Sequence, residues 1–333
     1  MAATLTEDVW SEQDTTPDAI ETALRELLRE RHAANQTLAP ARVLNLVVIV
    51  DYDWKGEIAN RLQRVGRYHA SRTVLCAVED GRTTLDARAV MSYEEPTDGA
   101  RLGVMVENVE IDMGPGHLQH LDTIIDPVVV PELETMLWSP HGHEEAIDLL
   151  LGMAQVILLD SDDQLDAPGA FERASRLLRS AYVVDLAWLR TTPWRERLAA
   201  SFDTPDRLAA LKTMCRLGVR HRSGSDASAL LLGGWLASRL GWHNGDVPVE
   251  LEQVEQEAPG LAGVTVYCSD DLSVSLDRGP GGLRLREEPG GHSVQVLGAS
   301  RGEAGILGEG VRQALLRDPT YGPALAAARR LVS

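Results

Sequence analysis

Lysine is nearly absent from this chain of 333 residues, and its scarcity limits the chemistry that the protein can perform. Among the 32 basic side chains, only Lys55 and Lys212 are lysines. A P-loop binds nucleotide phosphates through a Gly-Lys-Ser/Thr run, and neither lysine lies in such a run. Schiff-base catalysis needs a desolvated lysine, so it is confined to these two positions.

Basic residues of any kind are outnumbered by acidic ones. The chain holds 50 acidic side chains against 32 basic ones, which gives a formal net charge of -18. A protein that binds nucleic acid needs a basic face to neutralise phosphates. The charge balance therefore excludes nucleic acid as the main partner.

Cysteines and long apolar runs are also scarce. Cys76, Cys215 and Cys268 lie far apart and include no CxxC pair, which favours a reducing compartment over a disulfide scaffold. Residues 1–16 lack the basic region and apolar run of a signal peptide. The longest apolar stretch, residues 229–237, is shorter than the ~18 residues needed to span a bilayer. We therefore expect a cytoplasmic protein that does not insert into a membrane.

The familiar catalytic motifs are missing as well. The sequence contains no G-x-S-x-G nucleophile elbow, no H-E-x-x-H metal motif and no G-x-G-x-x-G run after a strand. We therefore assign no catalytic residue, cofactor or metal, and function has to be inferred from weaker patterns.

The first half of the chain alternates between strand and helix patterns. Residues 43–50, 73–78 and 155–159 are apolar runs of the kind found in strands that are covered on both faces. Helical spacing follows the first of these runs, and helices are also expected over residues 17–38 and 117–130. Two further strands, with a turn between them, complete the pattern. It predicts an α/β domain with a mixed sheet and flanking helices.

A different pattern begins after Asp166-Ala167-Pro168-Gly169. Residues 181–189 predict a strand, 192–214 a long helical region and 227–240 a strongly apolar helix. Four strands between residues 262 and 297, separated by Gly and Pro, predict an antiparallel meander with flanking helices. The expected organisation is an acidic tail with a helix (1–38), an N-terminal α/β domain (39–165) and a C-terminal α/β domain (166–333).

Two groups of polar residues are candidate ligand sites. Residues 141–145 (HGHEE) bring together two imidazoles and two carboxylates that could hold a metal with His117 and His120. Aspartates at 51–53 and 160–163 follow buried strands, where open α/β sheets bind their ligands. A polar loop entering a helix explains the first group, and turn chemistry explains the second. These structural interpretations are favoured.

An anion site is the basis of a second hypothesis about function. Ser223, Gly224 and Ser225 precede the apolar helix, and hydroxyls with free backbone amides at a helix N-terminus can bind phosphate. Arg72 could hold a phosphate or carboxylate through two hydrogen bonds. The alternatives are a helix capped by Asp226 and an arginine that closes a helix end. If the site exists, the protein is a sugar-phosphate or nucleotide binding module, or a hydrolase.

Residues 182–197, YVVDLAWLRTTPWRER, are the most unusual stretch. Trp188, Arg190, Trp194 and Arg195 belong to the residue types that are most enriched at interface hot spots. The alternative is a pair of core tryptophans with arginine ion pairs on a helix face. We take these four residues as candidates for a partner interface.

Several short blocks recur in the order found in one known family. They are Leu44–Val48, His69–Thr73, Pro131–Leu133 with Leu137-Trp138, Asp185–Arg190 with Thr192–Glu196, Gly234–Trp242 and Arg317–Tyr321. With these blocks the chain resembles, over about residues 40–330, the OpcA family. Its members are the glucose-6-phosphate dehydrogenase assembly proteins of actinobacteria and cyanobacteria.

The resemblance implies a function without catalysis. Family members bind glucose-6-phosphate dehydrogenase, assist its oligomerisation and activate it allosterically at the start of the oxidative pentose phosphate pathway. The expected partner is therefore this enzyme, and an actinobacterial origin is expected as well. The oligomeric state of the chain itself stays open.

Overall fold

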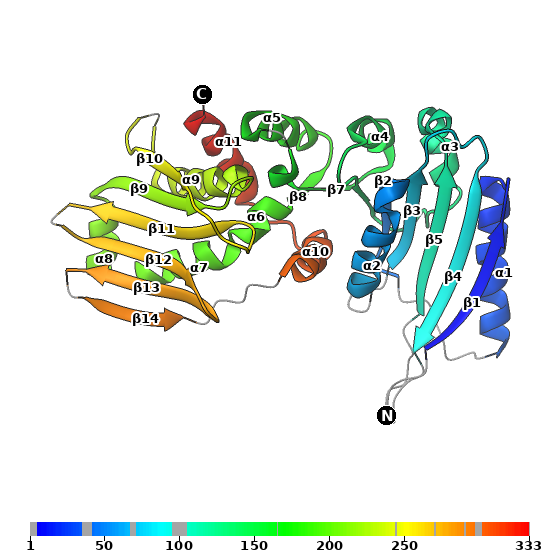
Figure 1. The fold of residues 1–333 in the computed structure, drawn as a ribbon, viewed down its shortest axis with the longest axis horizontal. Coiled ribbons are helices and arrows are strands. Elements are labelled where there is room, and N and C mark those ends of the chain that lie inside the picture. Colours follow the sequence, from blue (N-terminus) through cyan, green and yellow to red (C-terminus); the bar gives the residue numbers. More distant parts are fainter. Residues whose placement is uncertain are drawn as a thin grey trace. The chain divides into compact units, whose positions relative to one another are not determined.

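A computed structural model describes residues 5–34, 42–66, 71–94, 105–164, 166–243, 245–269, 271–289, 291–296 and 302–332. The chain divides into two compact units, unit 1 (Met1–Leu159) and unit 2 (Asp160–Ser333). Each unit combines a sheet with helices (Figure 1). The predicted fold class, mixed α/β with flanking helices in both halves, is confirmed.

Unit 1 is built on a mixed sheet. Its strands lie in the order β1-β4-β5-β3-β2-β6-β7, in which the run from β5 to β7 is parallel and β4 pairs antiparallel with both β1 and β5. The strands are β1 (Leu5–Glu12), β2 (Leu44–Asp51), β3 (Ser71–Val78), β4 (Asp86–Glu94), β5 (Met105–Met113), β6 (Thr135–Trp138) and β7 (Val156–Leu159). The helices are α1 (Pro17–Ala34), α2 (Lys55–Gly66), α3 (Leu121–Ile125) and α4 (Glu144–Leu150), with 3-10 turns η1 (Tyr52–Trp54), η2 (Pro115–His120) and η3 (Leu151–Met153).

The centre of this sheet is the core of unit 1. Every residue of β3 and β6 is buried, and only Asp51 of β2 is exposed. Central parallel strands are apolar along their whole length because both faces are covered. The prediction of covered strands over residues 43–50 and 73–78 is therefore confirmed.

Two predictions for unit 1 were wrong. The acidic residues before α1 are not a tail, because Leu5–Glu12 forms β1 and pairs with β4 through its backbone. Such an edge strand needs few apolar side chains, so its acidic sequence did not reveal it. The helix expected over 117–130 is shorter: it consists of η2 and α3 and ends at Ile125.

Unit 2 carries a sheet with the strand order β10-β9-β11-β12-β13-β14. The pairs from β9 to β14 are antiparallel, which confirms the predicted meander, and β10 is parallel to β9. The strands are β9 (Met214–His221), β10 (Val249–Gln253), β11 (Leu261–Cys268), β12 (Ser273–Gly279), β13 (Gly282–Glu288) and β14 (His292–Val296). The other elements are η4 (Ser161–Asp163), α5 (Ala167–Leu177), β8 (Tyr182–Asp185), α6 (Leu186–Arg190), α7 (Thr192–Ser201), α8 (Pro205–Leu211), α9 (Asp226–Leu240), α10 (Gly302–Gln313) and α11 (Tyr321–Leu331).

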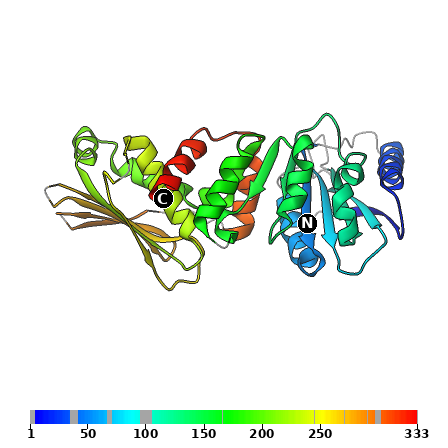
Figure 2. The same cartoon turned by 90° about the horizontal axis from the view of Figure 1, so that it is seen from above.

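Helices cover one face of this sheet (Figures 1 and 2). Trp194 of α7 and Leu232 of α9 pack with Leu217, Val264 and Leu276 in one apolar cluster. Burial of large apolar side chains at about 25 cal/mol per Å² is the main favourable term that holds the helices to the sheet.

Close packing of α9 on α11 depends on Gly234. A Cβ at this position would meet the backbone of Ala324 and Ala328 at less than 3.0 Å. Because glycine has no Cβ, the backbones of the two helices can come into contact at this point. In the interior of a helix, glycine otherwise destabilises the fold by about 1 kcal/mol relative to alanine.

Three expectations for unit 2 differ from the structure. The strand expected over 181–189 ends at Asp185, and α6 follows it, because Asp185 caps that helix. The helical region 192–214 breaks between α7 and α8 at Phe202–Thr204. Strand β10 was not predicted; its residues are mostly exposed, so it has no apolar pattern.

Candidate functional site

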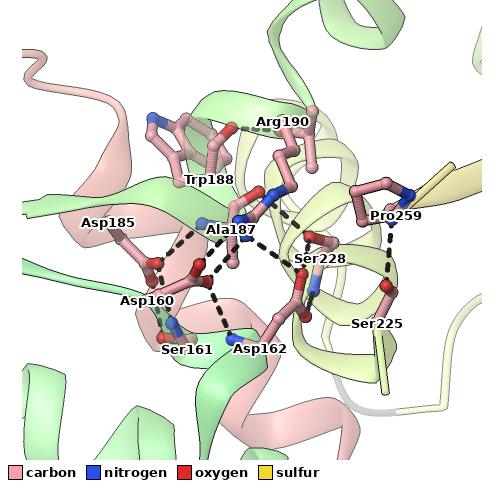
Figure 3. A network of polar contacts seen from close by, with 12 residues as sticks. Asp160, Ser161, Asp162, Asp185, Ala187, Trp188, Arg190, Ser225, Ser228 and Pro259 are labelled. Atoms are coloured by element: carbon pink, nitrogen blue, oxygen red, sulfur yellow. Dashed lines mark hydrogen bonds and ion pairs between the residues drawn. The ribbon is translucent and has the colours of Figure 1, made fainter. Parts of the chain in front are cut away.

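Three aspartates of unit 2 converge where β8, α6 and α9 meet. Asp160 and Asp162 flank the start of η4, and Asp185 ends β8. We call these residues, with Arg190, Ser161, Ser228 and Tyr321, the carboxylate cluster. Figure 3 labels its members other than Tyr321. Its carboxylates are almost completely buried, so each of them depends on partners within the protein for its solvation.

Arg190 supplies the positive charge of the carboxylate cluster. Its two terminal nitrogens donate to the two oxygens of Asp160 at 2.7 and 2.6 Å, and Asp162 lies 3.5 Å from the same guanidinium. A two-pronged ion pair of this kind holds both groups in one geometry. The Arg190 side chain is only 10% exposed, so solvent screens its charge little.

Asp162 connects η4 to the start of α9. Its carboxylate accepts the backbone N–H of Ser228 at 3.0 Å and the Ser228 hydroxyl at 2.5 Å. The same hydroxyl lies 3.1 Å from the Ala187 carbonyl oxygen. Because Ser228 is in the first turn of α9, a carboxylate here also satisfies an amide that has no partner within the helix.

Asp185 accepts four hydrogen bonds at a site that is only 1% exposed. One oxygen accepts the backbone N–H groups of Ser161 at 3.1 Å and Ala187 at 3.0 Å. The other oxygen accepts the Ser161 hydroxyl at 2.6 Å and the Tyr321 hydroxyl at 2.9 Å. A single carboxylate thereby joins η4, the cap of α6 and the first residue of α11.

Burial shifts the titration of this cluster. Desolvation, reinforced by the nearby charge of Asp160, raises the pKa of Asp162 to about 7. Desolvation also raises the pKa of Asp185 to about 6, although the hydrogen bond from Ser161 acts in the opposite direction. Burial raises the pKa of Tyr321 well above its ordinary value, so its phenol stays neutral and donates.

These raised pKa values make the stability of unit 2 depend on pH. In the unfolded chain both aspartates titrate in their ordinary range, so between that range and neutral pH the folded chain binds more protons. The stabilisation is present at acid pH and is lost as the pH rises through 6 and 7. We expect the midpoint temperature of unit 2 in scanning calorimetry to fall by several degrees between about pH 5 and about pH 8.

Two amide variants test the origin of this pH dependence. Asp162→Asn removes one titrating carboxyl and keeps an acceptor for the Ser228 amide, so the pH profile should become flatter. Asp203→Asn changes an exposed aspartate of the same unit and should leave the profile as steep as that of the wild type. A profile that is unaffected by Asp162→Asn would contradict this assignment.

A second group of contacts surrounds Trp188. Its indole N–H donates to Asp318 at 2.9 Å, and the Arg195 guanidinium lies over its ring, 3.5 Å from the centroid. Asp318 also accepts the Thr320 N–H and hydroxyl, which helps to keep the pKa of its carboxyl below the ordinary value. Burial lowers the pKa of Arg195 to about 10, so this residue remains charged at neutral pH.

The four candidate interface residues are largely buried within unit 2. Trp188 is 2% exposed and Trp194 is 1% exposed, the latter in the core between α7 and the sheet. Arg190 pairs with Asp160, and Arg195 stacks on Trp188. The burial of both indoles agrees with the alternative of core tryptophans, which composition could not distinguish from docking. Contact of this segment with a partner stays a prediction.

The candidate anion residues belong to different units. Arg72 belongs to unit 1, where it donates to Glu107 at 2.8 Å and to the Val128 carbonyl at 2.9 Å. Ser223 and Gly224 are exposed in unit 2, whereas Ser225 is buried and its hydroxyl accepts the Gly260 N–H at 3.0 Å. Ser225, and not Asp226, is the cap residue of α9, and its side chain makes no capping hydrogen bond.

The histidine loop of unit 1 forms local contacts. His143 pairs with Asp51 at 2.8 Å, and the His141 ring stacks on Trp54 with centroids 4.4 Å apart. Across the part of the chain that the structure describes, no three His, Cys, Asp or Glu side chains are grouped so that they could hold a metal ion. Within the same described residues, no helix is both long and apolar enough to cross a bilayer.

The sequence did not single out Ser228, Tyr321 or Asp318 as site residues. They lie far along the chain from their partners, with 136 positions between Asp185 and Tyr321 and 130 between Trp188 and Asp318. For Asp318 and Tyr321 the available signal was their place in the block Arg317–Tyr321, which the structure joins to the block Asp185–Arg190. Ser228 lies outside every block, so no sequence signal pointed to it. Chemically, the arrangement solvates buried charge and fixes η4, α6, α9 and α11 to one another.

Two family models match the chain. One, described as the N-terminal domain of a glucose-6-phosphate dehydrogenase subunit, matches residues 62–176. The other, described as the C-terminal domain of that subunit, matches residues 181–325. Together they cover well over half of the sequence.

Three curated cyanobacterial relatives, each named OxPP cycle protein OpcA, are similar to this chain. The protein of Synechococcus elongatus is 28% identical over 173 residues, which is 50% of this chain and 39% of that protein. Those of Synechocystis sp. and Nostoc punctiforme are 30% and 29% identical, over 38% and 46% of this chain and 27% and 37% of their own length. The chain thus matches well under half of each relative, and these organisms give no support to the expected actinobacterial origin.

Solved structures with a similar course of the chain are more distant. An oxidoreductase from Sinorhizobium meliloti has a TM-score of 0.46 and 10% identity, over 87% of this chain and 94% of that one. The apo scyllo-inositol dehydrogenase from Lactobacillus casei has a TM-score of 0.38 and 12% identity, over 87% and 94%. Likeness at this level supports no statement about activity. The two family models, in contrast, show that this chain belongs to the OpcA family of glucose-6-phosphate dehydrogenase assembly proteins.

Proposed function

We propose that this chain is a non-catalytic assembly factor and allosteric activator of glucose-6-phosphate dehydrogenase, and that it acts by protein–protein binding. The observation that carries the proposal is the match of both family models, since each is named for a subunit of that enzyme. The names of the cyanobacterial relatives place them in the oxidative pentose phosphate cycle, which agrees with the same role.

The contacts between the family-like blocks suggest that their polar residues stabilise the fold of unit 2. Asp185 and Arg190 from one block and Tyr321 from another are engaged with each other or with neighbouring residues in the carboxylate cluster. Gly234 of a third block allows α9 to pack against α11. We infer that these residues maintain a rigid support whose outer surfaces bind the enzyme.

Activation needs only a modest preference for one state of the enzyme. A protein activates an oligomeric enzyme when it binds the active form more tightly than the dissociated or low-affinity form. A tenfold shift corresponds to about 1.4 kcal/mol of differential affinity. A few well-placed side chains on one surface are enough for such a difference.

The state of the cysteines agrees with a cytoplasmic location for this activity. All three are free thiols in the structure. Burial raises the pKa of Cys76 to about 12, so this thiol is protonated and unreactive. Free thiols of this kind suit the reducing compartment in which we place the protein.

Kinetics of the purified dehydrogenase from the same organism test the proposal. Initial rates are measured across glucose 6-phosphate concentrations, with increasing amounts of this protein. We expect a lower apparent KM, or a higher kcat, that saturates as the protein is added, with an effect of about tenfold. Saturation also gives the affinity of the complex.

Two controls separate activation from other effects. Heat-denatured protein should not change the rate, and a sizing column should show the enzyme and the chain eluting together. Unchanged kinetics together with separate elution would contradict the proposed function. The small-molecule hypothesis is not proposed further, because Ser225 and Arg72 are each engaged within their own unit.

A further inference from the structure

The sheet of unit 2 has one face that the described helices of that unit leave uncovered (Figures 1 and 2). Alternation along the strands places apolar residues such as Leu217, Val266 and Leu276 on the side covered by α7 and α9. The residues between them lie on the opposite side. We call this side, from β10 at one edge across β9, β11 and β12 to β13, the open face.

Basic and acidic side chains are present in equal number on the open face. The basic ones are Arg216, Arg220, Arg284 and Arg286. The acidic ones are Glu250, Glu252, Asp277 and Glu288. The chain as a whole has a formal net charge of -18, so two copies repel each other over most of their surface. A neutral face removes this repulsion and allows a second copy to approach.

The unpaired charges lie at opposite ends of two rows on the open face. At one edge, β10 contributes Glu250 and Glu252. Arg216 lies 3.2 Å from Glu250, whereas Glu252 forms no ion pair among the described residues. On the other side, β13 contributes Arg284 and Arg286, which are exposed and likewise form no ion pair within the described part of the chain.

The strand register places Glu252 and Arg284 at the two ends of one row across the sheet. Along this row the paired residues are Glu252, Arg220, Gly263, Asp277 and Arg284. Arg220 passes over Gly263 to pair with Asp277, and a Cβ at this glycine would collide with the guanidinium. At equal distances from Gly263, each acid on one side corresponds to a base on the other.

The adjacent row on the open face has the same pattern. Its paired residues are Glu250, Gly218, Thr265, Ser275 and Arg286. The charges are again at the two ends, with opposite sign, and the residues between them are small. In both rows the midpoint is a residue of β11, so acid and base exchange places about a line that runs along this strand.

The open face is large enough for a specific interface. Its five strands lie about 4.8 Å apart and rise about 3.4 Å per residue, which gives a face of about 600 Å². Two such faces in contact bury about 1,200 Å² in total, the lower end of the range for stable complexes.

We propose that a second copy of this chain docks on the open face, through a two-fold axis that runs along β11. Rotation about this axis stacks the two sheets face to face with their strands aligned, and it exchanges the two ends of each row. Each acidic residue of β10 then lies over an arginine of β13 in the other copy: Glu252 over Arg284, and Glu250 over Arg286. The symmetry forms each contact twice. The inference concerns the assembly of the chain itself and goes beyond the proposed function.

A third row of the open face fits the same pairing. The register joins Arg216 to Tyr267, Tyr267 to Ser273, and Ser273 to Glu288. The Arg216 guanidinium lies over the Tyr267 ring, 3.8 Å from its centroid, and therefore lies along the sheet. About the same axis, this guanidinium is one strand, or about 4.8 Å, to the side of Glu288 of the second copy. Each charged side chain of the open face then faces a charge of opposite sign.

Charge reversal at either end of the rows tests the dimer in the full chain. Sedimentation equilibrium at about 50 mM salt, where charges are screened little, should show a dimer for the wild type. One variant combines Arg284→Glu with Arg286→Glu, and the other combines Glu250→Arg with Glu252→Arg. Each places like charges over one another, so the dimer dissociation constant should rise at least about hundredfold.

An equal mixture of the two variants gives the sharpest result. Each reversed end then meets an end of opposite charge, so the mixture should dimerise within about threefold of wild type. Misfolded variants would not recover in this way. The milder pair Arg284→Gln with Arg286→Gln should weaken the dimer about tenfold. The matched control, Arg239→Glu with Arg329→Glu, changes two exposed arginines on helices of the same unit and should stay within about twofold of wild type.

The other outcomes would overturn the proposal. A wild-type chain that stays monomeric at about 100 μM does not form this dimer. If the reversed variants then also lose binding to the dehydrogenase, the enzyme covers the open face instead. Dimers that persist in both reversed variants use another surface, and a mixture of folded variants that stays monomeric contradicts the pairing of β10 with β13. None of these results on self-association decides the proposed function, which the enzyme kinetics test separately.

Discussion

Replacing Asp185 with alanine is expected to lower the free energy of unfolding of unit 2 by about 4 kcal/mol or more. The carboxylate accepts four hydrogen bonds, from Ser161, Ala187 and Tyr321. Its removal leaves these donors buried without an acceptor, and each such group costs about 1–3 kcal/mol. For a domain of this length, such a loss should lower the melting midpoint of the full chain, measured by circular dichroism, by about 10 °C.

The amide variant Asp185→Asn is the matched comparison. Its oxygen can still accept the two backbone N–H groups, and the hydroxyls of Ser161 and Tyr321 can rotate to accept from the new amide nitrogen. We expect a loss of about half that of Asp185→Ala. If the free energy of unfolding of Asp185→Ala lies within about 1 kcal/mol of the wild-type value, the cluster does not stabilise unit 2.

The second large effect is expected at Arg190. Replacement by alanine leaves the buried carboxylates of Asp160 and Asp162 without their cation, which typically costs about 3–5 kcal/mol. Part of this loss should be recovered on lowering the pH, because the raised pKa of Asp162 means that its carboxyl gains a proton near neutrality. Chemical denaturation of the full chain at two pH values measures both effects.

Arg190→Lys distinguishes charge from geometry. Lysine keeps the positive charge but lacks the planar fork that holds both oxygens of Asp160, so an intermediate stability is expected. The exposed Arg239→Ala serves as the control and should be nearly neutral. If the alanine and lysine variants at position 190 are equally stable, the cation has no role in compensating the buried carboxylates.

Periodicity in the sequence predicted most of the fold, and its failures share one cause. The strands β2 and β3 and the helix α9 were predicted because burial on all sides leaves a continuous apolar run. Strands β1 and β10 lie at sheet edges and are held by backbone pairing, so their side chains carry no apolar pattern. Edge strands are therefore the elements that a single sequence describes least well.

The candidate site was predictable only in its parts. The aspartates at 160–163 were noticed because they follow a buried strand, yet turn chemistry explained them equally well. What makes them a cluster is contact with Ser228, which is 66 positions further along the chain. For Trp188 and Trp194, the residue type suggested a partner interface as readily as a place in the core, and only the packing revealed their burial.

The long spacing of these contacts also bears on how unit 2 folds. Tyr321 must reach Asp185 across 136 positions, and closing so large a loop costs chain entropy before its contacts form. Hairpins such as β12–β13 close over a few residues and can form early. We therefore expect α11 to dock late in folding, and until it docks the surface of α9 around Gly234 stays uncovered.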